Sequence, residues 1–496
     1  YKIAGTKEIS IDATDGYDIY LTIDSTVQRF VESAVKASSA TYSPEWLQLT
    51  VMNAKTGDIL ATSSTPSFDP NVRNIINYEN PLVTMTFEPG SVMKTYTYMC
   101  AIESGKYDGS ALYQSGSVEV ADAIIRDWNT VGWGNVTFDK GYEYSSNVGI
   151  VNLIRTYLSK AELRDCFKKY GFGNTTGIEL SREQKGRVNF NYEVEVANAG
   201  FGQGITTTAI QQLQALTIVA NDGKMVKPHI VKQIVNPDTN EIYYERQIES
   251  NTVVQKSTTD KIRELMYNTI HGNDLGATTG RAYNVEGLNV IGKTGTSQIY
   301  NTELGSYVIE TNENNYIFSF AGMFPAENPA YIIYGAMKSP LWGASSGLST
   351  AVTDVIRSIA KYENLSEREH ASIMNEYVVP SYTNQSVEKI VTELQQYGLQ
   401  PIMIGEGNRI INQIPLSGKT LVAGDKVMLL TNSAMYSMPS IIGWSKSDVI
   451  SLCALLQIPY TIEGNGYVMS QSIPEGSMIS SDSSLDVTFG SKYGVS

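Results

Sequence analysis

"FEPGSVMKTY", which runs from Phe87 to Tyr96, places a serine and a lysine three residues apart behind a Pro-Gly turn. Residues at i and i+3 lie on one face of a helix, so Ser91 and Lys94 are expected side by side. The stretch has two interpretations. Ser91 caps the start of a helix, or it is a nucleophile whose proton passes to Lys94, which requires a lysine with a lowered pKa.

Two later stretches add polar groups of the same kind. "YEYSSNVG" contains Ser145 and Asn147, whose hydroxyl and amide suit proton relay and the binding of a peptide carbonyl. "VIGKTGTSQ" ends a predicted strand with Lys293, two threonine hydroxyls and Gly295, which leaves room for a ligand backbone. Each stretch also has an ordinary structural interpretation, as a loop or helix cap and as a strand end.

Length and composition restrict the class of protein. A chain of 496 residues predicts about three domains, and 42% hydrophobic with 18% charged residues is typical of globular proteins. The formal net charge of −14, without a long Lys/Arg cluster, argues against a nucleic-acid-binding surface or a patch for anionic membranes.

The cysteines and histidines argue against a metal site. Cys100, Cys166 and Cys453 lie far apart, and no CxxC or Cys/His spacing occurs. Only three histidines are present, and none stands in a ligand motif. We therefore expect neither a metal nor another cofactor, while this low cysteine usage fits both a cytosolic and an extracytoplasmic bacterial protein.

The order of elements predicts a mixed α+β domain. "YDIYLTID" alternates like a strand, Ser25 is expected to cap the following helix, and "LQLTVMNAKTGDILATSSTPS" reads as a hairpin. Helices are predicted in "VMKTYTYMCAIESG", over 161–169 and in "TTAIQQLQALTIVANDG", and strands in "NVIGKTGTSQIY" and "YIFSFAGMFPAENPAYIIYGAMK". Early and late strands with helices between them favour one central sheet flanked by helices.

The C-terminal part contains a duplicated unit. Pro380 and Pro439 are 439 − 380 = 59 residues apart, and Pro415 and Pro474 are 474 − 415 = 59 apart. Each unit reads as proline, helix, strand, Gly-rich turn, "Q-x-P" or "Q-x-x-P", and a closing strand. The predicted domains are therefore 16–372, 377–433 and 434–496. Residues 1–15 are polar, with no initiator Met or signal-like segment, and are interpreted as the remnant of an N-terminal region.

The three polar motifs in this order resemble those of class B penicillin-binding proteins, of the penicillin-binding protein 2x type. The similarity continues in "DIYLTIDSTVQ", "NAKTGDILATSSTPSFDPN", "IRDWNTVGWG", "FGQGITTTAIQ", "ANDGKMVKP" and "AGMFPAENPAY", and so covers roughly residues 16 to 362. The two C-terminal units resemble PASTA domains. The resemblance implies a transpeptidase domain with a central antiparallel sheet and two small α+β domains, and it identifies residues 1–15 with the end of a pedestal domain.

The resemblance also assigns roles to residues. Ser91 would be the nucleophile and Lys94 its base, with Ser145 and Lys293 assisting proton transfer. The backbone N–H groups of Ser91 and Thr296 would form the oxyanion hole. The residues implied to hold or line the peptide site are Asn147, Gln298, Thr294, Gly295, Thr296, Trp128 and Asn129.

The implied activity is peptidoglycan D,D-transpeptidation during cell division, with covalent inhibition by β-lactams. The implied partners are stem peptides and lipid-linked precursors, a glycosyltransferase and divisome proteins, at the outer face of a Gram-positive cell membrane and at the septum. The alternatives are a β-lactam sensor and a muropeptide-binding scaffold. Val92 departs from the common threonine of this type, and the lost hydroxyl is expected to alter water placement or the acylation rate.

Overall fold

The structure is a computed structural model of the chain. It describes residues 16–69, 71–72, 75–237, 239–274, 278–299, 316–339, 345–363, 377–397, 399–421, 426–444, 446–464, 467–480 and 483–490. The chain divides into two compact units, one of Tyr1–Asn284 with Asn289–Val355 and one of Val285–Leu288 with Ile356–Ser496. No helix among the described residues is long and apolar enough to cross a membrane.

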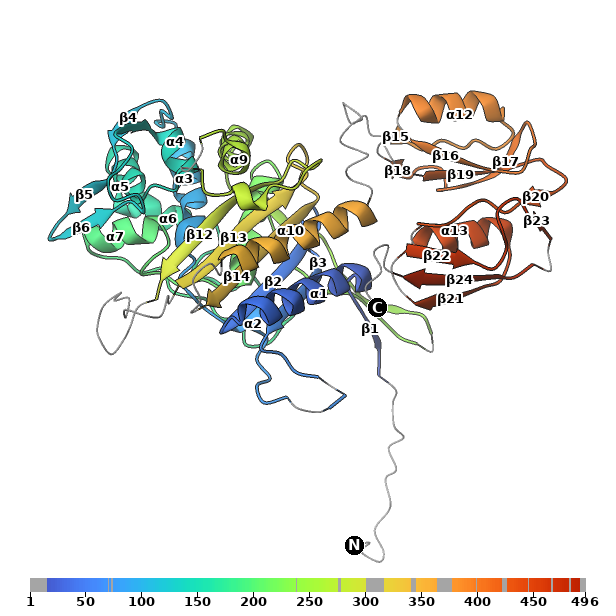
Figure 1. Cartoon of the computed structure of the whole chain (residues 1–496), viewed down its shortest axis with the longest axis horizontal. Coiled ribbons are helices and arrows are strands. Elements are labelled where there is room, and N and C mark those ends of the chain that lie inside the picture. The colour runs from blue at the N-terminus through green and yellow to red at the C-terminus, as the bar shows by residue number, and fades with distance from the viewer. Residues whose placement is uncertain are drawn as a thin grey trace, which may run out of the picture. The chain divides into compact units, whose positions relative to one another are not determined.

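A five-stranded antiparallel sheet forms the centre of the first unit (Figure 1). Its strands, in spatial order, are β12 (Ile291–Gln298), β13 (Tyr316–Phe324), β14 (Tyr331–Ser339), β2 (Trp46–Asn53) and β3 (Ile59–Thr65). β2 and β3 form the predicted hairpin, with Val51 opposite Ala61. The mixed α+β fold expected from the sequence is confirmed, and β12 lies at one edge of the sheet.

Helices pack against this sheet and so remove their apolar side chains from water. α1 (Ser25–Tyr42) buries Val27, Val31 and Val35, and in Figure 1 it lies beside α10 (Ser345–Tyr362). α8 (Ala209–Ala220) packs against β13 and β14 with all of its residues buried. α9 (Lys256–His271) contacts β12. The helices predicted over 161–169 and within 207–223 are confirmed as α6 (Lys160–Lys169) and α8.

The predicted cap of α1 is wrong by one residue. The Asp24 carboxylate accepts hydrogen bonds from the N–H groups of Thr26 and Val27 at 2.8 and 2.9 Å. Asp24 has extended backbone angles, whereas Ser25 is already helical. Aspartate is therefore the N-cap, and Ser25 is the first residue of the helix.

A largely helical layer lies beyond β12. It consists of α3 (Lys94–Glu103), α4 (Phe138–Glu143), α5 (Asn147–Tyr157), α6, α7 (Glu193–Gly200) and the strand pairs β4 (Leu112–Gln114) with β7 (Asn135–Thr137) and β5 (Ser117–Val120) with β6 (Ala123–Arg126). A disulfide joins Cys100 on α3 to Cys166 on α6. Sequence analysis missed this bond, because two cysteines 66 residues apart carry no pairing signal of their own.

Smaller elements complete the first unit. They are α2 (Pro81–Thr84), the turns η1 (Gly90–Met93) and η2 (Arg281–Tyr283), the sheet of β1 (Asp18–Leu21), β9 (Val231–Val235) and β10 (Ile242–Glu245), and the pair β8 (Lys224–Val226) with β11 (Ser250–Thr252). The strand predicted in "YDIYLTID" is confirmed as β1, which pairs with β9.

The second unit contains the duplicated domains. The first repeat has β15 (Tyr377–Val378), α12 (Val387–Gln396), β16 (Gln400–Ile404), β17 (Ile410–Ile414), β18 (Thr420–Leu421) and β19 (Lys426–Thr431). The second has β20 (Tyr436–Ser437), α13 (Lys446–Leu456), β21 (Tyr460–Gly464), β22 (Tyr467–Gln471), β23 (Met478–Ile479) and β24 (Leu485–Gly490). The sheets have the same topology, β16-β19-β17 and β21-β24-β22. The duplication is confirmed.

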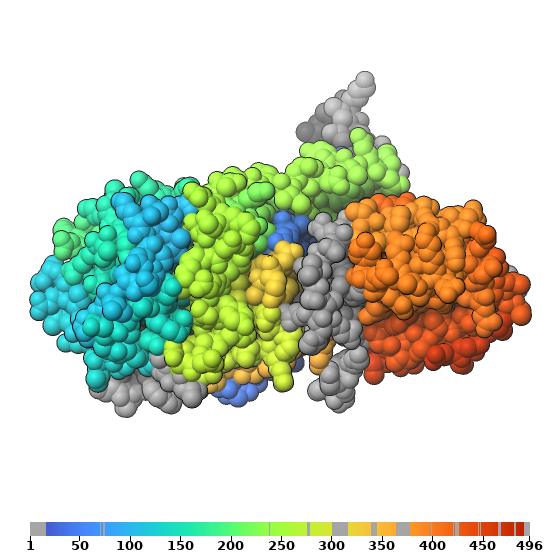
Figure 2. All heavy atoms as spheres, turned by 90° about the horizontal axis from the view of Figure 1, so that it is seen from above, coloured from blue at the N-terminus to red at the C-terminus, as the bar shows by residue number. Residues whose placement is uncertain are grey.

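Hydrogen bonds explain the repeated glutamine and proline. The side-chain amide of Gln413 donates to the carbonyls of Pro380 and Pro415, and that of Gln471 donates to the carbonyl of Pro439. Each glutamine thus ties its closing loop to the start of its repeat. Figure 2 shows the two repeats, orange and red, in contact. They share an apolar cluster that includes Met428 of the first and Trp444 of the second.

Candidate active site

The turn η1 positions the candidate nucleophile. Ser91 lies inside this 3-10 turn, and α3 follows directly with Lys94 as its first residue. The N-cap interpretation of Ser91 is wrong, because the turn is capped by Pro89, which has helical angles, and no side chain caps it. Among the described residues the Ser91 hydroxyl has no hydrogen-bond partner, and it faces a cleft.

Lys94 is fully buried and reaches towards the second motif. Its amine donates to the carbonyl and the hydroxyl of Ser145, the latter at 3.3 Å, and to the Oδ1 atom of Asn147 at 2.8 Å. It makes no hydrogen bond to Ser91 in this structure. The expected hydrogen bond between Lys94 and Ser91 is therefore not formed, although both residues belong to the same site. Catalytic hydrogen bonds are commonly long or poorly aligned until substrate binds.

Helix α5 and the residue before it hold the second motif. Ser146 is the N-cap of α5, its hydroxyl accepting from the N–H of Gly149 at 2.7 Å. Ser145 stands just before, at a φ of 57°, a left-handed conformation that is uncommon for a residue other than glycine and is found at functional sites. Asn147 opens the helix. The short sequence Ser-Ser-Asn therefore divides into a strained residue, a cap and the first helical residue.

Asp127 anchors this arrangement, and sequence analysis did not single it out. Its carboxylate accepts from the hydroxyl of Ser146 at 2.8 Å and from the N–H groups of Val148 at 3.0 Å and Gly116 at 2.9 Å. The side chain is only 2% exposed. Asp127 directly precedes Trp128 in the stretch "IRDWNTVGWG". The sequence does not show that its carboxylate is buried, so nothing in the stretch distinguished it from an exposed aspartate.

The third motif enters from the edge strand β12. The amine of Lys293 donates to the hydroxyl of Ser145 at 2.8 Å and to the carbonyl of Thr294 at 3.1 Å. Lys293 is fully buried. One serine hydroxyl therefore receives hydrogen bonds from both lysines, which connects α3, α5 and β12 through polar atoms.

Burial shapes the protonation of both lysines. It lowers the pKa of Lys293 to about 7. It also lowers the pKa of Lys94 well below its usual value, the positive charge of Lys293 lowers it further, and the carboxylate of Asp127 opposes both effects. A neutral amine is thus accessible near neutral pH, which is what a general base requires.

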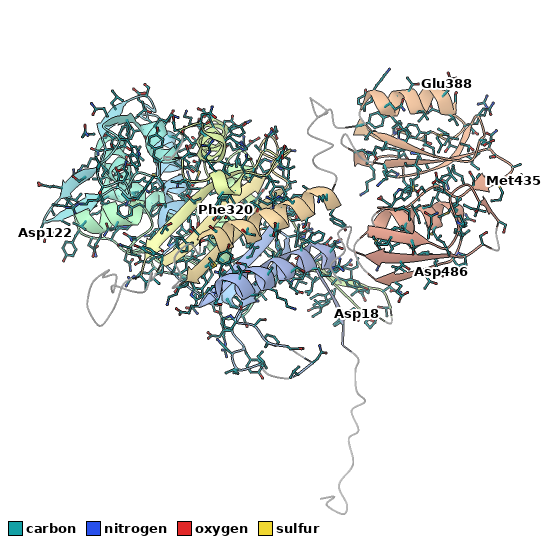
Figure 3. All side chains as sticks on the ribbon, viewed as in Figure 1. Asp18, Asp122, Phe320, Glu388, Met435 and Asp486 are labelled. Atoms are coloured by element: carbon teal, nitrogen blue, oxygen red, sulfur yellow. A yellow bond between two sulfur atoms is a disulfide. The ribbon has the colours of Figure 1, made fainter. Side chains whose placement is uncertain are left out.

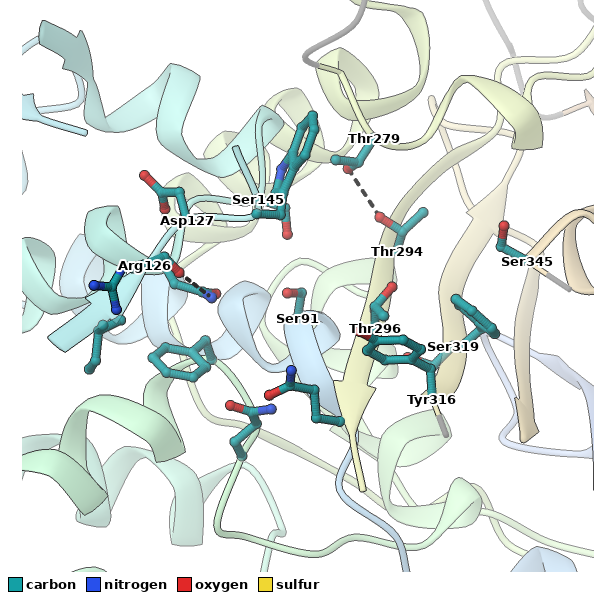
Figure 4. A pocket seen from close by; sticks show the side chains of 18 of the residues that line it. Ser91, Arg126, Asp127, Ser145, Thr279, Thr294, Thr296, Tyr316, Ser319 and Ser345 are labelled. Carbon is teal, nitrogen blue, oxygen red and sulfur yellow. Dashed lines mark hydrogen bonds between the residues drawn. The ribbon is translucent and has the colours of Figure 1, made fainter. Parts of the chain in front are cut away.

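The exposed side of β12 presents hydroxyl groups to the cleft. Thr294, Thr296 and Gln298 alternate with the buried Lys293, Gly295 and Ser297, as expected of a strand. The hydroxyl of Thr294 donates to that of Thr279 at 3.0 Å, which Figure 4 shows as a dashed line. Thr279 also lines the cleft and was not predicted.

Gly295 lines the cleft, so its expected role of leaving room for a ligand backbone stays a prediction. The glycine also makes room for the protein's own atoms, because a Cβ on Gly295 would lie 2.1 Å from the Ser319 hydroxyl and 2.8 Å from the Pro89 carbonyl. Val92 contributes a methyl group at 3.3 Å from the same position. A Cβ on Gly90, which has a φ of +66°, would lie 3.0 Å from the carbonyl of Thr296. Small residues thus bring η1 against β12.

The two predicted residues of the "DWN" stretch differ in outcome. Trp128 is 55% exposed, lines the cleft and donates from its indole N–H to the carbonyl of Tyr144 at 2.8 Å. Asn129 is not among the lining residues, and its side-chain amide instead donates to the Gly132 carbonyl at 3.0 Å. It stabilises the turn behind Trp128.

The cleft has a volume of about 1160 Å³ and is centred on Ser91 (Figure 4). Its walls come from β6, α7, β12, β13 and the start of α10. The sequence motifs on η1, α5 and β12 are therefore brought together at one place. Among the described residues, no group of three His, Cys, Asp or Glu side chains is arranged to bind a metal.

Comparisons with known proteins agree with this geometry. The model of the penicillin-binding protein transpeptidase domain matches residues 48–361, and that of the PASTA domain matches 377–433 and 436–491. Stage V sporulation protein D of Bacillus subtilis is 32% identical over 434 residues, 83% of this chain and 65% of that protein. Penicillin-binding protein PbpB of Mycolicibacterium smegmatis is 30% identical over 371 residues, 73% of this chain and 56% of that protein. The chain thus spans less than two thirds of the length of these relatives.

Solved structures give the same result. Penicillin-binding protein 2X from Streptococcus thermophilus has a TM-score of 0.65 at 26% identity, covering 99% of this chain and 74% of that one. Penicillin-binding protein 3 from Mycobacterium tuberculosis, complexed with aztreonam, has a TM-score of 0.65 at 27% identity, covering 72% of this chain and 82% of that one.

Proposed function

Since the chain belongs to the penicillin-binding protein transpeptidase family and carries two PASTA domains, we propose that it cross-links peptidoglycan stem peptides as a serine D,D-transpeptidase. The observation that carries the proposal is the polar connection of Lys94, Ser145 and Lys293 beside the free hydroxyl of Ser91. It supplies a nucleophile, a neutral amine and a proton relay in one cleft.

The first half-reaction forms an ester. The Ser91 oxygen attacks the carbonyl carbon of the penultimate D-alanine of a donor peptide, and its proton passes to the neutral amine of Lys94. The N–H groups of Ser91 and Thr296 stabilise the oxyanion, a contribution of about 3–4 kcal/mol per donor in other enzymes. The amide bond then breaks, and the leaving D-alanine amine takes up a proton relayed through Ser145 from a lysine. An acyl-enzyme and free D-alanine result.

The second half-reaction transfers the acyl group. The amine of a second stem peptide attacks the ester carbonyl, and the lysine–serine relay accepts the amine proton. The new peptide bond forms as the bond to the Ser91 oxygen breaks, and that oxygen regains a proton. A β-lactam enters the first half-reaction in place of the donor and remains as an ester, because its ring-opened leaving group stays attached.

The peptide is held at both sides of Ser91. In this proposal the hydroxyls of Thr294 and Thr296, which line the cleft, receive the terminal carboxylate of the donor. Asn147 holds a peptide amide, after its side-chain amide exchanges its present bond with the Arg126 carbonyl for the substrate. Gln298 and Trp128 line the remaining walls.

The cellular setting is part of the proposal. Disulfides are typical of oxidising compartments, so the Cys100–Cys166 bond supports a place at the outer face of the cell membrane. The proposed partners there are a glycosyltransferase and divisome proteins, at a Gram-positive septum. The name of the Bacillus subtilis relative favours a second candidate setting, cell-wall synthesis during sporulation. Depletion in growing and in sporulating cells distinguishes the two by the stage at which the wall fails.

The direct test of the activity is peptide cross-linking. The protein is incubated with a lipid-linked donor, a glycosyltransferase and an acceptor peptide, and cross-linked products are quantified by mass spectrometry. Cross-links are expected with the wild-type protein and not with Ser91→Ala. A protein that binds penicillin without forming cross-links would be a sensor, and muropeptide binding by residues 377–496 without cross-linking would indicate a scaffold.

A further inference from the structure

One wall of the cleft carries a positive charge that has no partner among the described residues. Strand β6 alternates, so that Ile125 is buried while Ile124 and Arg126 are exposed, and all three residues line the cleft. Among the described lining residues, Arg126 is the only cation, and the only anion is Asp127, whose carboxylate is buried and fully used. The chain has a formal net charge of −14, yet the one exposed charge among the described lining residues of the cleft is the positive charge of Arg126.

The guanidinium of Arg126 has no partner within the described part of the chain. Several other arginines are engaged: Arg246 pairs with Asp58 at 3.1 Å, Arg263 with Asp222 at 2.8 Å, and Arg155 donates to the Glu119 carbonyl at 2.8 Å. The side chains of Arg29 and Arg281 also have no hydrogen-bond or ion-pair partner among the described residues, but neither lines the cleft. Arg126 therefore combines a place in the cleft with five donors that remain available for a ligand.

The backbone of Arg126 is fixed to the catalytic centre. Its carbonyl accepts a hydrogen bond from the side-chain amide of Asn147 at 3.2 Å. The next residue, Asp127, holds the start of α5 through Ser146 and Val148, and β5 pairs with β6 so that Ser117 lies opposite Arg126. The charge therefore stands at a defined place relative to Ser145 and Asn147, which is what specificity requires.

We infer that Arg126 is a specificity-determining residue that pairs with a free carboxylate on the stem peptide, at the residue preceding the D-alanyl-D-alanine end. This inference rests on the proposed transpeptidase function. Thr294 and Thr296 lie on the other side of Ser91 in Figure 4, so the two sites would bind two separate anionic groups of one peptide.

The surroundings of Arg126 suit such a side chain. Val194 and Asn198 of α7, together with Ile124 and Phe201, also line the cleft, and α7 contacts β5, the strand that pairs with β6. The apolar surfaces of Val194, Ile124 and Phe201 can cover the methylene groups of an extended amino acid, while the planar guanidinium binds the carboxylate in a bidentate manner. A peptide with an amine in place of that carboxylate would meet a like charge instead.

The test uses two penicillins that differ by one carboxylate. Benzylpenicillin has a neutral acyl side chain, and its α-carboxy derivative carbenicillin has an anionic one. The second-order rate of Ser91 acylation is measured for both by intact mass, and the ratio of the two rates is the readout. Arg126→Ala is expected to lower the anionic-to-neutral ratio about tenfold, Arg126→Lys to lower it less, and added salt to lower the wild-type ratio.

Arg155→Ala is the matched control, because it removes the same group from α5 outside the cleft, and it is expected to leave the ratio unchanged. The peptide test uses D-alanyl-D-alanine peptides whose preceding residue carries a side-chain amine capped with acetyl or with succinyl, in competition with labelled penicillin. An unchanged ratio in Arg126→Ala for both probe pairs, with benzylpenicillin still acylating Ser91, overturns the inference. Competition by inorganic phosphate as strong as by the succinyl peptide would also contradict it. Loss of acylation by every probe in the wild-type protein would instead refute the proposed function.

Discussion

The amine of Lys293 donates a hydrogen bond to the hydroxyl of Ser145 at 2.8 Å, and both side chains are buried. Lys94 reaches the same hydroxyl from α3 at 3.3 Å. Two buried lysines that share one hydroxyl cannot both be charged without a large electrostatic penalty. The proposed chemistry follows from this relationship, since it makes a neutral amine available next to Ser91.

The first prediction concerns the pH dependence of acylation. Burial lowers the pKa of Lys293 to about 7, and burial with the neighbouring charge lowers that of Lys94. The neutral amine is the active form, so the acylation rate should fall on the acid side, by about tenfold per pH unit once the pH is well below the apparent pKa of the pair. The measurement is the rate of adduct formation with benzylpenicillin between pH 5 and 9, with tryptophan fluorescence as a control for folding. A flat profile would contradict the assignment of a lysine base.

The second prediction concerns the stability of Lys293→Met. The folded protein releases the Lys293 proton near pH 7, whereas the unfolded chain keeps it up to about pH 10.4. The unfolded state therefore binds more protons in this window, so the stability of the wild-type protein rises with pH there, and below pH 7 the buried charge is fully unfavourable. The methionine removes that charge, and the difference in unfolding free energy between variant and wild type should be about 4 kcal/mol more favourable at pH 6 than at pH 10, because the two pKa values differ over about three pH units in this range and each unit corresponds to about 1.36 kcal/mol.

Urea unfolding at the two pH values measures this difference. Lys261→Met is the control, since Lys261 is half-buried and paired with Asp139, and burial does not lower its pKa overall. A difference that is equal at pH 6 and pH 10 would show that Lys293 is not the buried titrating group.

The third prediction concerns Asp127. Asparagine in its place keeps one acceptor oxygen for three donors, so Asp127→Asn should lower the free energy of unfolding by about 2–3 kcal/mol. The variant also removes the negative charge that raises the pKa of Lys94, so the acid limb of its acylation profile should move to lower pH.

A purely structural role would slow acylation without moving that limb. The matched control is Asp122→Asn on the same hairpin, where Asp122 is exposed at the turn between β5 and β6 (Figure 3). Asp122→Asn is expected to change neither the stability nor the profile.

The fourth prediction concerns Val92. Its side chain is fully buried and contacts the place occupied by Gly295. A threonine keeps the shape but buries a hydroxyl among apolar atoms, so Val92→Thr should lower the free energy of unfolding by about 1–2 kcal/mol and change the acylation rate less than about threefold. Val83→Thr in α2, which is equally buried, is the control for the general effect of a buried hydroxyl. A tenfold faster acylation in Val92→Thr alone would mean that the hydroxyl acts in the reaction.

Much of the fold and the site could be predicted because the relevant signals are local. Alternation and turn residues identified β2 and β3, and the proline offset identified the repeats. The three motifs identified Ser91, Ser145 and Lys293, which the structure brings around one cleft. The hydrogen bonds of Lys94 to the second motif, in contrast, depend on tertiary distance that spacing does not encode.

The remaining features depend on contacts between distant segments. Nothing in the sequence pairs Cys100 with Cys166, or shows that Gly295 makes room for Ser319. The role of Asp127 depends on three donors that the sequence does not connect with it. They are the hydroxyl of Ser146 and the N–H groups of Val148 and Gly116. The prediction that Ser91 is an N-cap is wrong because α3 is preceded by the 3-10 turn η1. Ser91 lies inside this turn, and Pro89, which precedes it, has helical angles.

The most direct test of the account is the mass of the intact protein after reaction with benzylpenicillin, followed by mapping of the modified peptide. We predict a mass increase of one penicillin, located at Ser91 within "FEPGSVMKTY", and its complete loss in Ser91→Ala. No adduct on the folded wild-type protein, or an adduct that persists in Ser91→Ala, would contradict the central claim that Ser91 is the acylated nucleophile.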